Sequence, residues 1–331
     1  MEEYKLSVAS SPHASSPVGT KNLMRDVLIA LIPAMAMGIY VFGPRALTTS
    51  LVSVIFCEIF EWGYCKLMHK PNPCGDLSAA ITGVLLVFVC PVTLPYWTII
   101  IGDFFAIVVV KQLFGGLGYN FANPAIVGRI AMALGFTGAM TSYTYPENGI
   151  DALASATPLA VEETAQNAGS YVTLLLGNHG GVLGETCAIT LLIGGIYLIW
   201  TKVISPTIPV TYLATVAVFS LLCGYDPIYQ LLSGGLILGA FFMATDYVTS
   251  PNTPKGEVIF GIGAGLLVVF IRYFGGYPEG VCYSILIMNI CVWLIDKATL
   301  PKRFGVTAEM RKAEKEKAKA AKKAAKEGAE A

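Results

Sequence analysis

The stretch VIFGIGAGLLVVFIRY, residues 258–273, decides the fold class of this sequence. Its side chains are apolar or small, apart from the guanidinium of Arg272 near the end. A helix that crosses a bilayer needs roughly 17 to 25 largely apolar residues. Together with its flanking residues, this run predicts a membrane-spanning helix.

Similar apolar runs recur along most of the chain. Of the 331 residues, 55% are hydrophobic and 13% are charged, whereas a soluble domain carries about 25% charged residues. We therefore expect an all-α integral membrane protein with about ten transmembrane helices. The sequence contains no motif for binding nucleic acid. The predicted helices cover residues 27–41, 46–65, 77–89, 96–114, 124–140, 183–200, 208–223, 228–244, 258–273 and 280–295.

Lysine and arginine residues indicate the orientation, because they are retained on the cytoplasmic side of the cell membrane. With a cytoplasmic N-terminus, most of them, Lys111 included, fall in the cytoplasmic connections and the tail. The long loop at 141–182 contains none, although it bears acidic residues. We expect both termini to be cytoplasmic and this loop to be extracytoplasmic.

The long loop divides the predicted helices into two sets of five, at residues 27–140 and 183–296. With an odd number in each set, the second set is inverted relative to the first, as in many transporters. The third helix of each set is short or rich in small residues, which favours a central site between broken helices. Small residues that permit close helix packing explain the same pattern. A cytoplasmic segment, 1–26, and a charged cytoplasmic tail, 297–331, complete the organisation.

Charged residues inside the apolar segments are candidates for an ion path. Each costs roughly 2.5–3.5 kcal/mol at the bilayer centre on insertion scales. Glu58 and Glu61 lie on one face of the second segment, three residues apart. Asp103 lies in the fourth segment and Arg129 in the fifth. These residues predict a proton or sodium relay, and an ion pair between Arg129 and one of the acids is the alternative.

The histidines and cysteines predict no metal site. The 3 histidines lie in separate polar stretches, and the 8 cysteines show neither a CxxC pair nor zinc spacing. Most cysteines fall inside apolar runs, where a free thiol behaves as a small hydrophobic group.

The sequence DALASATPL, which starts at Asp151, is the sharpest feature of the long loop. Pro158 forces Thr157 into an extended conformation. A threonine hydroxyl on an exposed, extended segment is accessible to an enzyme that attaches a group. Taken alone, the pattern also fits an ordinary surface turn.

Motifs spread over nearly the whole chain are similar to those of the NqrB/RnfD family. They are GDLSAAITGVLL from Gly75, KQLFGGLGYNFANPA from Lys111, DALASATPL from Asp151, GNHGGVLGETCAI from Gly177, GAFFMATDYVTSP from Gly239 and YPEGVCYSILIMNI from Tyr277. The resemblance implies a membrane component of the Rnf complex, which couples electron transfer between ferredoxin and NAD+ to translocation of Na+ or H+. It also implies the A, B, C, E and G subunits of that complex as partners, a flavin transferase for maturation, and no catalytic residue in this chain.

The resemblance further implies flavin cofactors. In the family, a threonine is joined through a phosphodiester to FMN, and Thr157 matches that position. Asp151 and Ser155 lie in the stretch that resembles the recognition signal of the transferase, although in the family a glycine often precedes the Ala-Thr pair that is Ala156-Thr157 here. Relatives also hold a noncovalent riboflavin or FMN in the membrane. The loop with Asn120 and Asn123 is expected to border such a site.

A passive channel or solute transporter of the urea- or ammonium-channel type is the alternative function. Inverted five-helix sets with broken third helices also build such channels. The segment from Asp151 to Thr157 favours the redox function, because a channel has no need of an attachment motif.

Overall fold

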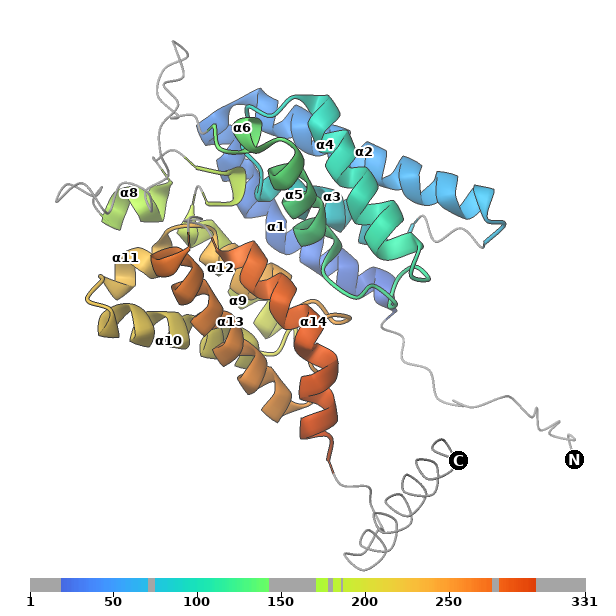
Figure 1. Cartoon of the computed structure of the whole chain (residues 1–331). Coiled ribbons are helices and arrows are strands. Elements are labelled where there is room, and N and C mark those ends of the chain that lie inside the picture. Colours follow the sequence, from blue (N-terminus) through green and yellow to red (C-terminus); the bar gives the residue numbers. More distant parts are fainter. Residues whose placement is uncertain are drawn as a thin grey trace, which may run out of the picture.

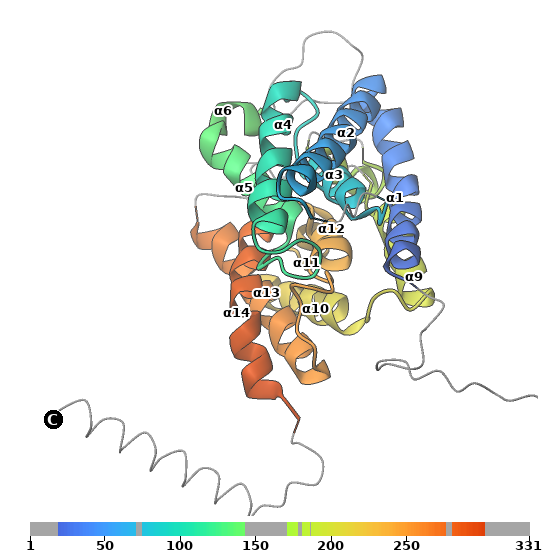
Figure 2. The ribbon, with the colours of Figure 1, turned by 90° about the vertical axis from the view of Figure 1, so that its right-hand side faces the viewer.

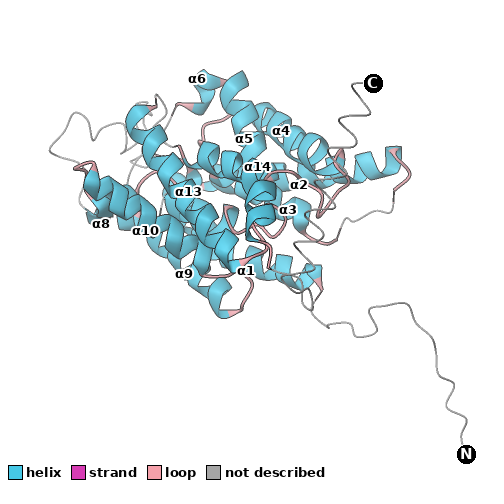
Figure 3. Ribbon diagram, turned by 60° about the horizontal axis from the view of Figure 1, so that its bottom comes forward, coloured by secondary structure: helices cyan, strands magenta, loops and turns pink. Residues whose placement is uncertain are grey.

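The computed structural model describes residues 19–70, 75–142, 171–177, 181–185, 187–275 and 280–301. Within these ranges the regular elements are helices, and no strand occurs (Figure 3). Four of the described helices are long and apolar enough to cross a membrane: α1, Thr20–Phe42; α2, Pro44–Leu67; α13, Pro254–Phe274; and α14, Val281–Thr299. The predicted all-α membrane class is confirmed at this level.

The other elements are shorter. In the first half they are α3, Ser78–Phe88; α4, Tyr96–Phe104; the π-helix η1, Phe105–Gln112, which continues α4; α5, Pro124–Gly135; and α6, Thr137–Met140. The second half has α8, Tyr171–Leu176; the 3-10 turn η2, Leu183–Glu185; α9, Ala188–Trp200; α10, Thr207–Leu222; α11, Pro227–Leu232; α12, Leu236–Leu238; and the π-helix η3, Gly239–Met243.

Prolines and short polar side chains begin several of these helices. A proline is tolerated in the first turn because its missing N–H would have no helical partner there, and α2, α5, α11 and α13 all begin with one. The side chains of Asn123, Asp226 and Thr253 accept hydrogen bonds from the first turns of α5, α11 and α13. Gly43 separates α1 from α2 at φ 77°, a conformation that glycine adopts without strain.

The eighth predicted segment, 228–244, is interrupted in the structure. Gly234 and Gly235 have φ values of 72° and 65° between α11 and α12. Broken backbone is tolerated at membrane depth where protein surrounds it. Here Nη2 of Arg272, on α13, donates to the carbonyl oxygen of Ser233 at 3.1 Å. The third predicted segment forms α3, which has 11 residues and is short for a full span.

The two halves of the chain lie side by side (Figures 1 and 2). In the figures, α1 to α6 run from blue to green and form one group, and α9 to α14 run from yellow to red and form the other. α1 packs along α9 and joins the groups. A Cβ atom at Gly194 of α9 would lie 2.3 Å from the carbonyl oxygen of Ala30 in α1. The missing side chain lets these two helix backbones approach closely.

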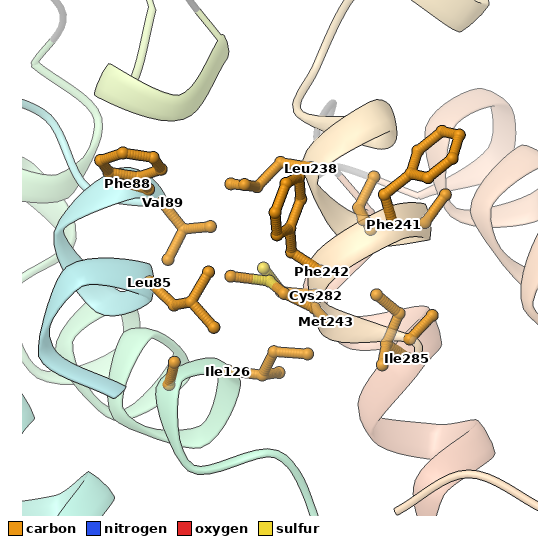
Figure 4. Close-up of a cluster of buried hydrophobic side chains, with 14 of the residues drawn as sticks. Leu85, Phe88, Val89, Ile126, Leu238, Phe241, Phe242, Met243, Cys282 and Ile285 are labelled. Atoms are coloured by element: carbon orange, nitrogen blue, oxygen red, sulfur yellow. The ribbon is translucent and has the colours of Figure 1, made fainter. Parts of the chain in front are cut away.

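The core lies between the two groups (Figure 4). Side chains from α3 and α5 meet side chains from α12, η3 and α14. They include Leu85, Phe88, Ile126, Leu238, Phe242 and Ile285, all buried. Many weak dispersion contacts hold such an interface together, because apolar side chains gain little by leaving lipid. This core fixes the relative positions of the helices that carry the buried polar side chains.

Each predicted apolar segment coincides with helix, although several are shorter or more broken than predicted. The number of spans and the inverted repeat stay predictions. Residues 143–170 of the long loop lie outside the described residues, and so do Asp151, Ser155 and Thr157.

Candidate functional site

A pocket with a cavity volume of about 110 Å³ lies where the two groups of helices meet. α1, α3 and the end of η1 line one side, and η3, the end of α9 and residues 245–248 line the other. Most of the lining is apolar, as at Ile81, Leu85, Phe241 and Phe242. Cofactor sites show the same combination of apolar walls with a few polar groups.

The polar side chains of the pocket come from both halves of the chain. They include Ser78, Thr82, Lys111, Asn120, Asn123, Thr245 and Asp246. Asn123 Oδ1 accepts from the backbone of Ala125 at 3.1 Å, and its Nδ2 donates to the carbonyl oxygen of Met243 at 3.3 Å. It thereby caps α5 and ties that helix to η3. Asn120 Nδ2 donates to the carbonyl oxygen of Ala122 at 3.1 Å, and its side chain lines the pocket with that of Asp246. Both asparagines of the predicted loop are thus on the pocket wall.

Lys111 is the one cationic side chain among the described residues that line this pocket. It lies in the last turn of η1 and is 2% exposed. Its Nζ is 2.6 Å from Ser78 Oγ and 2.6 Å from Glu61 Oε1. The sequence placed Lys111 in a cytoplasmic connection, but the structure buries it. An ammonium group is tolerated in such surroundings when a counter-ion and hydrogen bonds accompany it.

Glu61 is fully buried on α2 and completes this ion pair. Its Oε1 accepts from Lys111 Nζ and from Gln112 Nε2, the latter at 2.7 Å. Its Oε2 has no hydrogen-bond partner among the described residues. One carboxylate oxygen therefore keeps the capacity to take a proton or to contact a cation.

The buried face of α2 continues from Glu61 as a polar stripe. Ser53, Cys57 and Glu61 follow one another four residues apart, and all three are buried. Asp103, at the end of α4, meets the stripe: its Oδ1 accepts from Ser53 Oγ at 2.6 Å and from Cys57 Sγ at 3.3 Å. Its Oδ2 is buried without a partner in the described part of the chain. Eight residues of helix span about 12 Å, so the stripe links two buried acids over that length.

The other two residues of the predicted relay are placed differently. Glu58 is only half-buried on α2. Nε of Arg129 donates to the carbonyl oxygen of Val89 at 2.8 Å, and its guanidinium acts electrostatically on Glu185 beside a second, smaller cavity. Glu61 pairs with Lys111, and an ion pair between Arg129 and an acid of the relay stays a prediction.

After the predicted attachment motif, the described residues resume at Tyr171. The first element there is α8, and the hydroxyl of Tyr171 donates a hydrogen bond to the carboxylate of Asp226 at the start of α11. This bond lowers the pKa of Asp226 below its ordinary value. It ties the end of the long loop to the second group of helices.

Several polar residues of the site carry little signal in the sequence. Lys111 could have been found, because a lysine directly after the run AIVVV is costly unless it is paired. Ser78, Gln112 and Asp246 look like ordinary polar residues near segment ends. Their place in the site depends on contacts between segments that are distant in the sequence.

A single family accounts for nearly the whole chain. The model of the NQR2, RnfD, RnfE family matches residues 7–305. The chain belongs to this family. The resemblance inferred from the motifs is therefore confirmed, and with it the class of multi-pass membrane protein.

Three relatives are similar to this chain over nearly their full length. The D subunit of the Na+-translocating ferredoxin:NAD+ oxidoreductase complex of Acetobacterium woodii is 47% identical over 311 residues, which cover 93% of this chain and 98% of the relative. The D subunit of the proton-translocating ferredoxin:NAD+ oxidoreductase complex of Clostridium ljungdahlii is 41% identical, with 90% and 96% covered. The D subunit of the ion-translocating oxidoreductase complex of Actinobacillus succinogenes is 35% identical, with 90% and 97% covered.

Proposed function

We propose that this chain is the D subunit of an ion-translocating ferredoxin:NAD+ oxidoreductase complex of the Rnf type. In this role it carries electrons on bound flavin and couples their transfer to movement of Na+ or H+ across the cell membrane. The observation that carries the proposal is the buried ion pair of Lys111, which lines the pocket between the two halves, and Glu61, which lies behind Lys111. The names of the relatives support both the redox part and the ion-translocating part.

The proposed topology has ten spans with both termini in the cytoplasm. Residues 27–140 and 183–296 form two inverted sets of five helices, and the loop at 141–182 faces outward. The helical content of every predicted segment and the break between α11 and α12 support this arrangement. The uneven distribution of lysine and arginine supports the orientation.

The first proposed cofactor is FMN, joined through its phosphate to the hydroxyl of Thr157. Thr157 serves as an anchor, and the flavin ring supplies the electron chemistry. Asp151 and Ser155 belong to the sequence that a flavin transferase recognises. Support comes from the motif and from membership in the family.

The second proposed cofactor is a noncovalent riboflavin or FMN in the pocket between the two halves. An isoalloxazine ring has an apolar benzenoid end and a pyrimidine end with hydrogen-bonding groups. The apolar side chains around Phe241 and Phe242 fit the first end, and Asn120, Asp246 and Lys111 offer donors and acceptors for the second. A cation beside a flavin stabilises the negative charge of its reduced form.

The proposed partners follow from this role. The A, B, C, E and G subunits of the complex exchange electrons with this chain, because the chain itself shows no motif for ferredoxin or NAD+. The proposed ion path uses Glu61 and Asp103, whose free carboxylate oxygens are buried on the polar stripe.

A denaturing gel under ultraviolet light tests the covalent flavin. The chain is produced with a flavin transferase, and we expect a fluorescent band that Thr157→Ala removes and Thr164→Ala, in the same loop, retains. Mass spectrometry of the peptide from Asp151 to Leu159 then locates the group. A chain that stays dark with the transferase present contradicts the redox role and favours the passive channel, whereas fluorescence in Thr157→Ala contradicts the assignment of the residue.

Release of flavin by acid precipitation tests the pocket. We expect purified complex to release a noncovalent flavin, and Asn120→Leu to lower its affinity roughly 2- to 10-fold through loss of one hydrogen bond. Tyr119→Leu is the matched control, because Tyr119 is 71% exposed in the same loop and does not line the pocket. Equal flavin content at limiting flavin in both variants counts against this pocket as the site.

A further inference from the structure

A single ammonium group contacts both the pocket and the buried carboxylate stripe. Lys111 lines the pocket, and its Nζ lies 2.6 Å from Glu61 Oε1. The side chains of Lys111 and Glu61 are 2% and 0% exposed, so water screens this pair weakly. A charge that enters the pocket therefore acts on the same group that neutralises Glu61.

The stripe behind Lys111 has unused capacity for a cation. Glu61 Oε2 and Asp103 Oδ2 are buried and have no hydrogen-bond partner among the described residues. Buried polar atoms in native proteins are nearly always satisfied. Two carboxylate oxygens in this state are suited to a proton or Na+.

Other ionisable groups surround Lys111 at greater distance. Ser78 Oγ donates to Asp76 Oδ1 at 2.6 Å, so Asp76 is linked to the ammonium through one hydroxyl. Cys65 Sγ is 3.8 Å from Gln112 Oε1. Asp246 contributes an acid to the pocket from the second half of the chain. In the described part of the chain Lys111 forms its ion pair with Glu61 and not with Asp76 or Asp246.

We propose that Lys111 couples the charge of the pocket's occupant to cation binding at Glu61. This proposal rests on the proposed flavin in the pocket. One electron that enters the pocket from a neighbouring redox subunit adds one negative charge there and attracts the ammonium. Glu61 is then neutralised less completely, and one Na+ or one proton binds at its Oε2. When the electron leaves, the ammonium returns to Glu61 and the cation is released, so charge balances in both directions.

The local structure permits this shift. Lysine has a flexible four-carbon chain with a compact charge at its end, so Nζ can turn between the pocket and Glu61 while the backbone stays in place. Lys111 also lies in the π-helix η1. Such helices are rare and are frequent at functional sites.

Linkage makes the coupling measurable. If an electron in the pocket tightens cation binding by some factor, the cation must favour reduction of the pocket's flavin by the same factor, and the midpoint potential of that flavin rises accordingly. For one cation per electron, the potential rises by about 59 mV for each tenfold increase in cation concentration while the site titrates.

The experiment is a spectroelectrochemical titration of the noncovalent flavin in the whole complex. One arm varies Na+ at fixed pH, and the other varies pH without Na+, so that the two arms distinguish the ions. We expect a cation-dependent potential in the wild type, loss of that dependence in Lys111→Met, and recovery in Lys111→Arg. Lys66→Met removes an exposed lysine at the end of α2 and should keep the dependence.

Binding of radioactive Na+ to oxidised and reduced complex, or proton uptake on reduction, gives a second measurement. The wild type should take up one more cation per chain when reduced, and Lys111→Met should show no difference. If the complex with Lys111→Met fails to assemble or to hold flavin, the Glu61→Gln variant is measured in its place. Glu61→Gln keeps the lysine in the pocket wall and removes the cation site. Full cation dependence in either variant overturns the proposal, as does its absence from the wild type. A wild-type complex without noncovalent flavin overturns the proposed function instead.

Discussion

Replacement of Lys111 by methionine should destabilise the chain by about 3–5 kcal/mol, because it leaves the carboxylate of Glu61 buried without its counter-ion. The structure sets this magnitude. The two charged atoms are 2.6 Å apart, and the side chains are 2% and 0% exposed. Gln112 Nε2, at 2.7 Å, still donates to the carboxylate in the variant. We therefore expect a cost near the lower end, about 3 kcal/mol.

Thermal unfolding of the purified chain in detergent, followed by tryptophan fluorescence, measures this cost. For a chain of this size about 2 °C corresponds to 1 kcal/mol, so Lys111→Met should lower the Tm by roughly 6 °C. Glu61→Gln should also destabilise, because the ammonium then keeps Ser78 Oγ and loses its counter-ion. The double variant, which replaces the pair by neutral groups of similar size, should be much closer to the wild type than the sum of the single variants.

The control for this series is Lys66→Met. Lys66 is exposed on the same helix as Glu61, and its Nζ lies 4.7 Å from the ring centre of Trp62. Its loss should cost at most about 1 kcal/mol. The reasoning is refuted if Lys111→Met matches this control, or if the single effects simply add in the double variant.

Further predictions concern packing, the ion path and the end of the long loop. Gly194→Ala should lower the Tm by an amount that corresponds to about 1–3 kcal/mol, since the new Cβ meets a backbone carbonyl at 2.3 Å. Gly63→Ala is the control and should not lower the Tm, because its Cβ would have no atom within 4 Å. Equal effects of the two substitutions would contradict close packing of α1 on α9. Asp103→Asn should reduce the ions translocated per electron in proteoliposomes, because it removes one of the two carboxyl groups on the polar stripe. An unchanged ratio excludes Asp103 from the path. Tyr171→Phe should speed hydrogen–deuterium exchange in α8, because it removes the hydrogen bond to Asp226, and unchanged exchange would show that other contacts hold α8.

Helix positions were largely predictable from the sequence, because a lipid environment requires long apolar runs. The run at 258–273 forms α13 with slightly wider bounds, Pro254–Phe274. Predictions were poorer where a segment bends or breaks. The run at 96–114 changes from α4 to the π-helix η1, and 228–244 divides at Gly234 and Gly235. Such changes depend on neighbouring helices that satisfy the backbone, and hydropathy does not record them.

The candidate site was predictable only in part. Glu61 and Asp103 were suspected because charge in an apolar run is costly. The sequence does not reveal the partners of these two acids. Ser53, which contacts Asp103, and Lys111, which contacts Glu61, are distant from them in the sequence. Asn120 and Asn123 were suspected from their loop. Their place on the pocket wall required residues from the other half of the chain.

The sequence by itself determined the membrane class and the family, and it predicts the attachment motif around Thr157. These depend on composition, on the order of residues along one segment and on motifs, all of which can be read without a fold. The tertiary structure alone decided that Lys111 is buried against Glu61 and that both halves of the chain build one pocket. The physical reason is that an ion pair is an interaction between segments: its energy depends on distance and on exclusion of water, and packing of separate helices determines both.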